Sequence, residues 1–165
     1  MDKTTALSLV QQQHVLDEYA EKLASELYIG YSPSEDVAIR VDAEPLELGV
    51  DQAIPCGLIL NELVSNALKY AFPDRRKGEI AIKIVRPEPG FIAVTVRDDG
   101  AGRPADLDWR NAKSLGLKIV QILARQLGGT IELRREGGTK FQFTFPFEDR
   151  TREPDSKPVV LEATV

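Results

Sequence analysis

The segment 60–71 carries a cluster of polar residues whose types could bind a metal ion and phosphates. Glu62, Asn66 and Tyr70 recur every four residues, with Lys69 beside them, so on a helix they share one face. A carboxylate, an amide oxygen and an ammonium group suit Mg²⁺ with a polyphosphate, because Mg²⁺ takes oxygen ligands and keeps several waters. The alternative is an ordinary solvated helix face. Asn66 argues against it, because asparagine is a poor helix former in a helix interior.

A second candidate site is the run Asp98-Asp99-Gly100-Ala101-Gly102. Apolar residues alternate over 92–96, which predicts a strand whose buried face also carries Asp98, while Asp99 points the other way. A buried carboxylate needs hydrogen-bond donors, and the exocyclic amino group of adenine is one, whereas guanine places an oxygen there. The alternative is a turn aspartate that binds nearby backbone N–H groups.

A third candidate site is Ser114-Leu115-Gly116-Leu117, which precedes a predicted helix over 117–127. The unpaired N–H groups at a helix start form an anion site, and Gly116 would let a phosphate come close. The alternative is an ordinary serine-capped helix start. The segment lacks the GxxxxGK[ST] pattern, so it is not a P-loop.

Apolar spacing predicts the elements that must position these segments. Helices are expected over 17–28, 51–71 and 117–127, and strands over 37–41, 80–84, 92–96, 131–133 and 141–145. Asp51 is the expected N-cap of the middle helix, with Pro55 in its first turn, and Gly128–Gly129 should close the last helix. The order predicts an α+β fold: one mixed sheet, largely antiparallel toward its C-terminal strands, with helices on one face.

The overall composition narrows the class of protein. The 165 residues are enough for one domain, and the net charge of −5 with a pI near 5.0 argues against a dedicated nucleic-acid binder. One cysteine and one histidine cannot form a Cys/His zinc site. No apolar run is long enough to span a membrane, and the N-terminus lacks a secretory pattern. We therefore expect a cytoplasmic protein without a membrane segment.

The ordered set of motifs resembles the GHKL superfamily, and most closely the catalytic domains of two-component sensor histidine kinases. Residues 61–70, Asn-Glu-Leu-Val-Ser-Asn-Ala-Leu-Lys-Tyr, are similar to the family's N box. The runs 98–102 and 114–117 resemble its two glycine boxes, the second in a reduced form, and Gly138-Thr139 resembles its terminal Gly-Thr pair. The continuation through Pro73 and the Ser-Leu-Gly-Leu form resemble the subgroup close to the HWE kinases.

This resemblance implies a Bergerat-type two-layer α/β sandwich that binds ATP and Mg²⁺. The catalytic residues that it implies are Glu62 and Asn66: Asn66 would coordinate Mg²⁺, and Glu62 would orient either water or the acceptor imidazole. Asp98 would read adenine. The ATP-binding residues that it implies are Asn61, Asn66, Lys69, Tyr70, Asp98, Gly100, Gly102, Ser114, Leu115, Gly116, Leu117 and Thr139.

The implied function is transfer of the ATP γ-phosphoryl group to a histidine on a separate or upstream phosphoacceptor domain, with a response regulator downstream. The alternatives are a GHKL-type ATPase switch, an anti-sigma-type serine kinase, or an interaction module without nucleotide binding. His14 lacks the family's phosphoacceptor sequence, so we expect it to be a surface residue at a helix end.

Three parts of the chain follow from these patterns. Residues 1–16 are expected to be a helical remnant or linker from a dimerisation helix, and residues 17–147 the ATP-binding catalytic domain. Residues 148–165 are a charged, proline-bearing tail or linker. Its apolar end, Val159–Leu161, either pairs with a sheet edge or begins a further segment.

Overall fold

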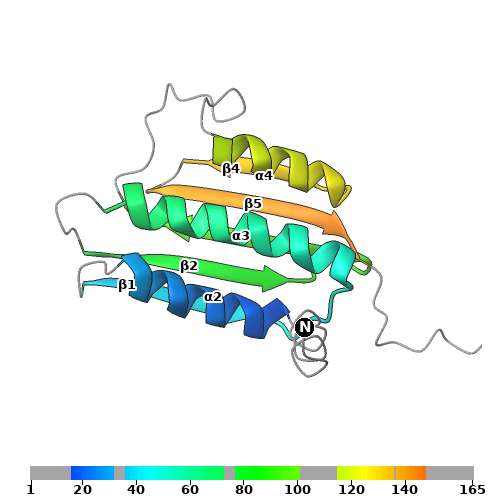
Figure 1. The fold of residues 1–165 in the computed structure, drawn as a ribbon, viewed down its shortest axis with the longest axis horizontal. Coiled ribbons are helices and arrows are strands. Elements are labelled where there is room, and N and C mark those ends of the chain that lie inside the picture. Colours follow the sequence, from blue (N-terminus) through cyan, green and yellow to red (C-terminus); the bar gives the residue numbers. More distant parts are fainter. Residues whose placement is uncertain (1–15, 32–35, 73–76, 101–114, 136, 148–165) are drawn as a thin grey trace, which may run out of the picture.

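The protein is a two-layer sandwich in which helices cover one face of a mixed sheet (Figure 1). The computed structural model describes residues 16–31, 36–72, 77–100, 115–135 and 137–147. Its elements are α2 (Leu16–Tyr31), β1 (Val37–Ala43), α3 (Val50–Tyr70), β2 (Gly78–Val85), β3 (Phe91–Asp98), α4 (Leu115–Gln126), β4 (Thr130–Arg134) and β5 (Thr139–Pro146). The predicted α+β class and the two-layer architecture are confirmed.

The sheet has the strand order β1-β2-β3-β5-β4. β1 and β2 are parallel, and the other neighbouring pairs are antiparallel. A parallel pair needs a long crossover connection, which α3 supplies between β1 and β2. The sheet is therefore mixed, and antiparallel from β2 onward, as the sequence pattern predicts.

The core lies between the sheet and the helical layer. α3 is the middle helix, with α2 on one side and α4 on the other (Figure 1). The apolar residues at helical spacing over residues 60–71 are buried, apart from the half-buried Leu68: Leu60, Leu63, Val64, Ala67 and Ala71. Alternate residues of the strands meet them, with Ile80, Ile82 and Ile84 on β2 and Phe141, Phe143 and Phe145 on β5 all nearly inaccessible. This packing holds the polar end of α3 against the strand ends.

The start of α3 differs from the prediction. The N-cap is Gly49, without a side-chain cap hydrogen bond, so the expectation that Asp51 caps the helix is wrong. Tertiary contacts bring the chain into the helix earlier: Leu48 is buried just before it, and Gln52 Nε2 donates to the Pro146 carbonyl at 2.7 Å. Pro55 consequently lies in the second turn, where it cannot donate to the carbonyl four residues back.

The two ends of α4 show how well local signals predict boundaries. The helix begins at Leu115, two residues before the predicted start at residue 117. Its end is as predicted: Gly128 has φ of 69°, and the N–H groups of Gly128 and Gly129 donate to the carbonyls of Arg125 and Ala124 at 2.9 Å each. This pattern is a Schellman motif, which needs a residue that tolerates positive φ.

Candidate nucleotide-binding site

The polar face of α3 is not uniformly solvated. Asn66 and its neighbour Ser65 are 8% and 6% exposed, whereas Tyr70 is 66% exposed and Lys69 is also exposed. The solvated-face alternative therefore fits the outer residues of the cluster but not Asn66. Burial of an amide side chain costs free energy unless it finds partners, so Asn66 is not an ordinary solvated surface residue.

Asp98 lies where the strand alternation predicts. It is the last residue of β3, is 6% exposed, and is flanked by Ile80 of β2 and Thr139 of β5. Its Oδ1 accepts a hydrogen bond from the Gly100 N–H at 3.1 Å. The hydrogen bond to a nearby backbone N–H that a turn aspartate would make is therefore present. The Asp98 carboxylate nevertheless lies on the helix-covered face of the sheet.

Asp99 has a separate, structural role. Its Oδ1 accepts a hydrogen bond from the Glu79 N–H at 2.7 Å, and its own N–H donates to the Glu79 carbonyl at 3.3 Å. These two bonds tie the end of β3 to β2. The two adjacent aspartates therefore have different roles: Asp99 anchors the end of β3 to β2, whereas Asp98 points inward.

Close backbone approaches bring the end of β3 against the end of α3 and the start of β5. A Cβ on Gly100 would overlap the carbonyl oxygen of Ala71, and a Cβ on Gly138 would overlap the carbonyl oxygen of Asp98. Gly138 also has φ of 132°, a conformation that side-chain-bearing residues rarely adopt. The following residue, Thr139, is 5% exposed. Three motifs that are far apart in sequence therefore meet at one place.

The fourth motif reaches the same region through Glu62. A Cβ on Gly116, in the first turn of α4, would overlap Glu62 Oε1. The Glu62 carboxylate therefore lies directly against the start of α4, where the N-terminal N–H groups favour negative charge. Leu117 is buried and holds this turn in the core, while Leu115 is 73% exposed.

Other predicted residues either are not described by the structure or make contacts outside this cluster. Gly102, Ser114 and His14 fall outside the described residues, and Asn61 is exposed on α3. The ammonium group of Lys69 lies 5.8 Å from the ring centroid of Tyr31 on α2, a cation–π contact. Sequence reasoning missed this contact because Tyr31 has no motif around it and the two helices meet only in the fold.

The site fits Mg²⁺ better than a metal caged by protein side chains. Within the described ranges, no three His, Cys, Asp or Glu residues form a group that could hold a metal ion. Mg²⁺ does not need such a group, because it commonly binds through one or two protein oxygens together with phosphates and waters. The buried Asn66 is a suitable oxygen donor of this kind.

The chain matches a known family of ATPase domains. Residues 51–149 match the family model described as "Histidine kinase-, DNA gyrase B-, and HSP90-like ATPase", and the chain belongs to this family. Membership implies ATP binding. No helix in the described part of the chain is long and apolar enough to cross a bilayer.

The relatives that the chain resembles are histidine kinases. It is 34% identical over 115 residues to the blue-light-activated histidine kinase 2 of Erythrobacter litoralis, covering 69% of this chain and 33% of that protein. It is 32% identical over 152 residues to the sensor histidine kinase PdtaS of Mycobacterium tuberculosis, covering 89% and 30%. The chain thus spans about a third of the length of these curated relatives.

Solved structures agree with the sequence relatives. The histidine kinase domain of the Erythrobacter litoralis EL346 blue-light-activated kinase matches with a TM-score of 0.74 at 32% identity, covering 80% of this chain and 61% of that one. The mycobacterial sensor histidine kinase MprB shares the fold, with a TM-score of 0.64 at 20% identity. The resemblance inferred from the motifs is confirmed.

Proposed function

We propose that this chain is the catalytic, ATP-binding part of a sensor histidine kinase. It binds Mg·ATP and transfers the γ-phosphoryl group to a histidine on a separate or upstream phosphoacceptor domain. That domain then passes the phosphoryl group to a response regulator. The observation that carries the proposal is the burial of Asn66 and Asp98 at the place where the motif segments converge. The step belongs in the cytoplasm, where ATP is available.

Each polar residue has a role in this proposal. Asn66 supplies an oxygen to Mg²⁺, and the Asp98 carboxylate accepts a hydrogen bond from the adenine amino group. Lys69 and Tyr70, with Asn61 at the rim, face the phosphates; Lys69 would leave the Tyr31 ring to do so. The N-terminal turn of α4 offers backbone N–H groups to phosphate oxygens. Catalysis then rests on positioning and on charge neutralisation by Mg²⁺.

Glu62 is the proposed catalytic carboxylate. It is half-buried, and the start of α4 confines its position. In a kinase it would orient the acceptor imidazole for attack on the γ-phosphorus. The same position would suit a water molecule, so an ATPase switch is the second candidate function, and turnover without an acceptor distinguishes the two.

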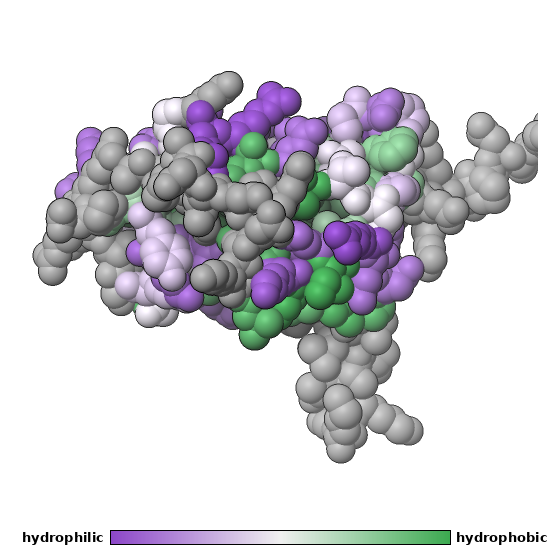
Figure 2. Space-filling view, turned by 90° about the horizontal axis from the view of Figure 1, so that it is seen from above, coloured by the Kyte–Doolittle hydropathy of each residue, from purple (hydrophilic) through white to green (hydrophobic). Residues whose placement is uncertain are grey.

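An exposed apolar surface supports delivery of the histidine by another segment. α4 exposes Leu115, Ile119 and Ile122, and α3 exposes Ile54 and Leu58. Figure 2, which views the molecule from the side of α4 and β4, shows hydrophobic side chains (green) gathered in its lower part. Since Leu115 begins the helix turn that contacts Glu62, a helix docked on this surface would approach the proposed site.

The test is incubation with labelled ATP and a separately made phosphoacceptor helix domain. We expect acid-labile phosphohistidine on the acceptor domain and none on this chain, because a short tether rarely places His14 in line with the γ-phosphorus. His14→Ala should leave ATP binding unchanged. Steady ATP hydrolysis without acceptor labelling would favour the ATPase, and phosphorylation of this chain that disappears in His14→Ala would make His14 the acceptor.

A further inference from the structure

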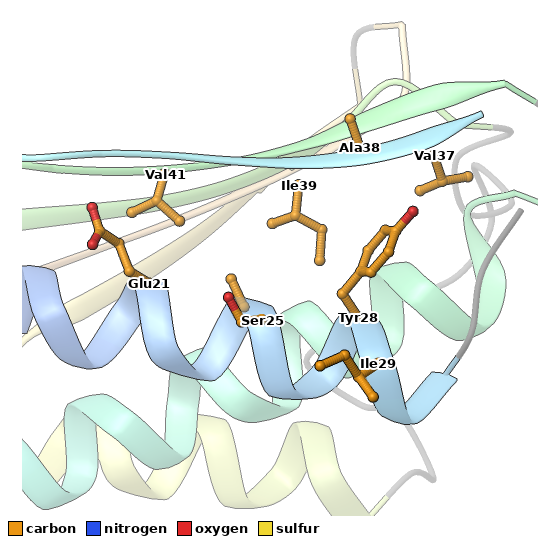
Figure 3. A pocket seen from close by; sticks show the side chains of 9 residues that line it. Glu21, Ser25, Tyr28, Ile29, Val37, Ala38, Ile39 and Val41 are labelled. Carbon is orange, nitrogen blue, oxygen red and sulfur yellow. The ribbon is translucent and has the colours of Figure 1, made fainter. Parts of the chain in front are cut away.

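A long groove separates α2 from the edge strand β1. It has a volume of about 730 Å³. Glu21, Ser25 and Tyr28 of α2 point across it toward β1, which contributes Val37, Ile39 and Val41 (Figure 3). Ile29 is 75% exposed, and Ile39 and Val41 are only half-buried although they lie on the helix-facing side of the strand. The helical layer thus leaves apolar surface uncovered along this edge of the sheet.

The strand beside the groove has one unpaired side. Among the described strands, β1 pairs only with β2 and ends the sheet. An edge strand presents N–H and C=O groups to any extended segment that lies alongside it, and such a segment gains backbone hydrogen bonds as well as pockets for alternate side chains. The groove supplies the pockets, and the edge supplies the backbone partners.

The C-terminal segment leaves the fold at the correct end of the sheet. The Phe147 N–H donates to the Gly90 carbonyl at 2.7 Å, and the Glu44 N–H donates to the Ile84 carbonyl at 3.0 Å. The chain therefore exits beside the β2–β3 turn, at the end of the sheet where β1 finishes. A segment that returned along β1 from there would run antiparallel to it.

The length of the tail is sufficient. Residues 148–158 form an eleven-residue connection, which spans up to about 36 Å when extended. From β5, the position outside β1 is four strand spacings away, or about 19 Å. Pro158 precedes the apolar residues, and proline is tolerated at the first residue of a strand.

We propose that residues 159–165 of this chain add to β1 as an antiparallel sixth strand that fills the groove. With Leu161 opposite Val41, the alternation places Val159, Leu161 and Ala163 on the helix-facing side. The same register puts Glu162 opposite Arg40, which is exposed on the other face of β1. Opposite charges at directly facing positions stabilise an antiparallel pair.

Two other occupants are less suited to this edge. Residues 1–15 adjoin the start of α2 in sequence, and the pattern there predicts a helical remnant or linker rather than a strand. A second copy of the chain would place β1 against β1, which makes the pairing depend on protein concentration. The experiment separates both from the proposed tail.

The experiment measures hydrogen–deuterium exchange on the full chain and on a chain that ends at Ser156. We expect the truncated chain to exchange about tenfold or more faster over residues 37–43, and a synthetic peptide of residues 157–165 to restore the slower exchange. Unchanged exchange after truncation would overturn the proposal. Protection that depends on protein concentration, or that the peptide fails to restore, would also overturn it.

Point variants test the register and use the alternation as a control. Leu161→Ser should speed exchange of β1 nearly as much as truncation, whereas Val160→Ser, on the outward side, should have a much smaller effect. Glu162→Arg should weaken protection, and Arg40→Glu in the same chain should recover it. Equal effects of Leu161→Ser and Val160→Ser would contradict strand addition in this register.

Discussion

The two ends of the helical layer bury different kinds of residue: polar residues at one end and apolar residues at the other. Where the C-terminal end of α3 meets β3, β5 and the start of α4, the protein buries Asn66, Asp98 and Thr139. Where α2 packs on β1 and α3, the buried residues are apolar: Leu16, Ala20, Leu23, Ala24 and Val37. Buried polar groups cost free energy unless they are partnered, which supports the proposal that the first region binds a ligand, whereas the second is an apolar packing contact.

Asn66→Ala should strongly weaken nucleotide binding. We expect the Mg²⁺-dependent affinity for ATP to fall by at least about 10–100-fold, the loss seen when even the groups that orient a metal's ligands are removed. Ser65→Ala is the matched control, because Ser65 is equally buried on the same helix but has no proposed role. Calorimetry in Mg²⁺ and in EDTA would measure both, and unchanged binding by a folded Asn66→Ala chain would show that the assignment of Asn66 is wrong.

Two glycine substitutions separate the positioning of the Glu62 side chain from the packing of β3 against α3. In Gly116→Ala, the added Cβ meets the flexible end of the Glu62 side chain, so the fold should change by less than about 0.5 kcal/mol. Phosphotransfer should fall about 100-fold, within the range for a displaced acid or base, as in Glu62→Gln. In Gly100→Ala, the Cβ meets the Ala71 backbone carbonyl, which should cost about 1–3 kcal/mol of stability.

Chemical denaturation and phosphotransfer rates measured on both glycine variants would check this contrast. If Gly116→Ala transferred phosphate at the parental rate, the position of Glu62 would not matter. If Gly100→Ala were as stable as the parent, the close approach of β3 to α3 would not be required.

The smallest effect concerns the apolar region. Burial raises the pKa of the Cys56 thiol from 9.0 to about 12, and burial also raises the pKa of Tyr19, which contacts α3 from α2. Because the unfolded thiol ionises first, stability is full below about pH 9 and declines as pH rises toward 12, by at most about 1.4 kcal/mol per pH unit for this group. Denaturation from pH 8 to 10 should show this decline, and Cys56→Ala should lack the thiol's share.

The sequence predicts the fold and the inward aspartate well, because alternation and helical spacing are local signals. Asp98 follows from the phase of its strand, and the close of α4 follows from Gly128. The start of α3 could not be predicted in the same way, since the contact between Gln52 and the Pro146 carbonyl joins residues far apart in the chain. The burial of Asn66 could not be predicted in this way either, because spacing within one helix does not show what packs against its polar face.

Contacts between segments account for the rest of the site. The proximity of Glu62 to Gly116 and the contact between Lys69 and Tyr31 depend on how α3 packs between α4 and α2. No spacing rule within one segment encodes such contacts. The groove beside β1 is of the same kind, since it exists only when α2 and the sheet edge are placed together.

The most direct test of the account is a calorimetric comparison of ATP and GTP binding in Mg²⁺, for the parent chain and for Asp98→Ala. We expect the parent to bind ATP much more tightly than GTP, because a buried carboxylate accepts from the adenine amino group and repels the guanine oxygen. Asp98→Ala should lose about 1.5–3 kcal/mol of ATP affinity, the range for a charged hydrogen bond. Equal affinity of the parent for ATP and GTP would contradict the proposed role of Asp98.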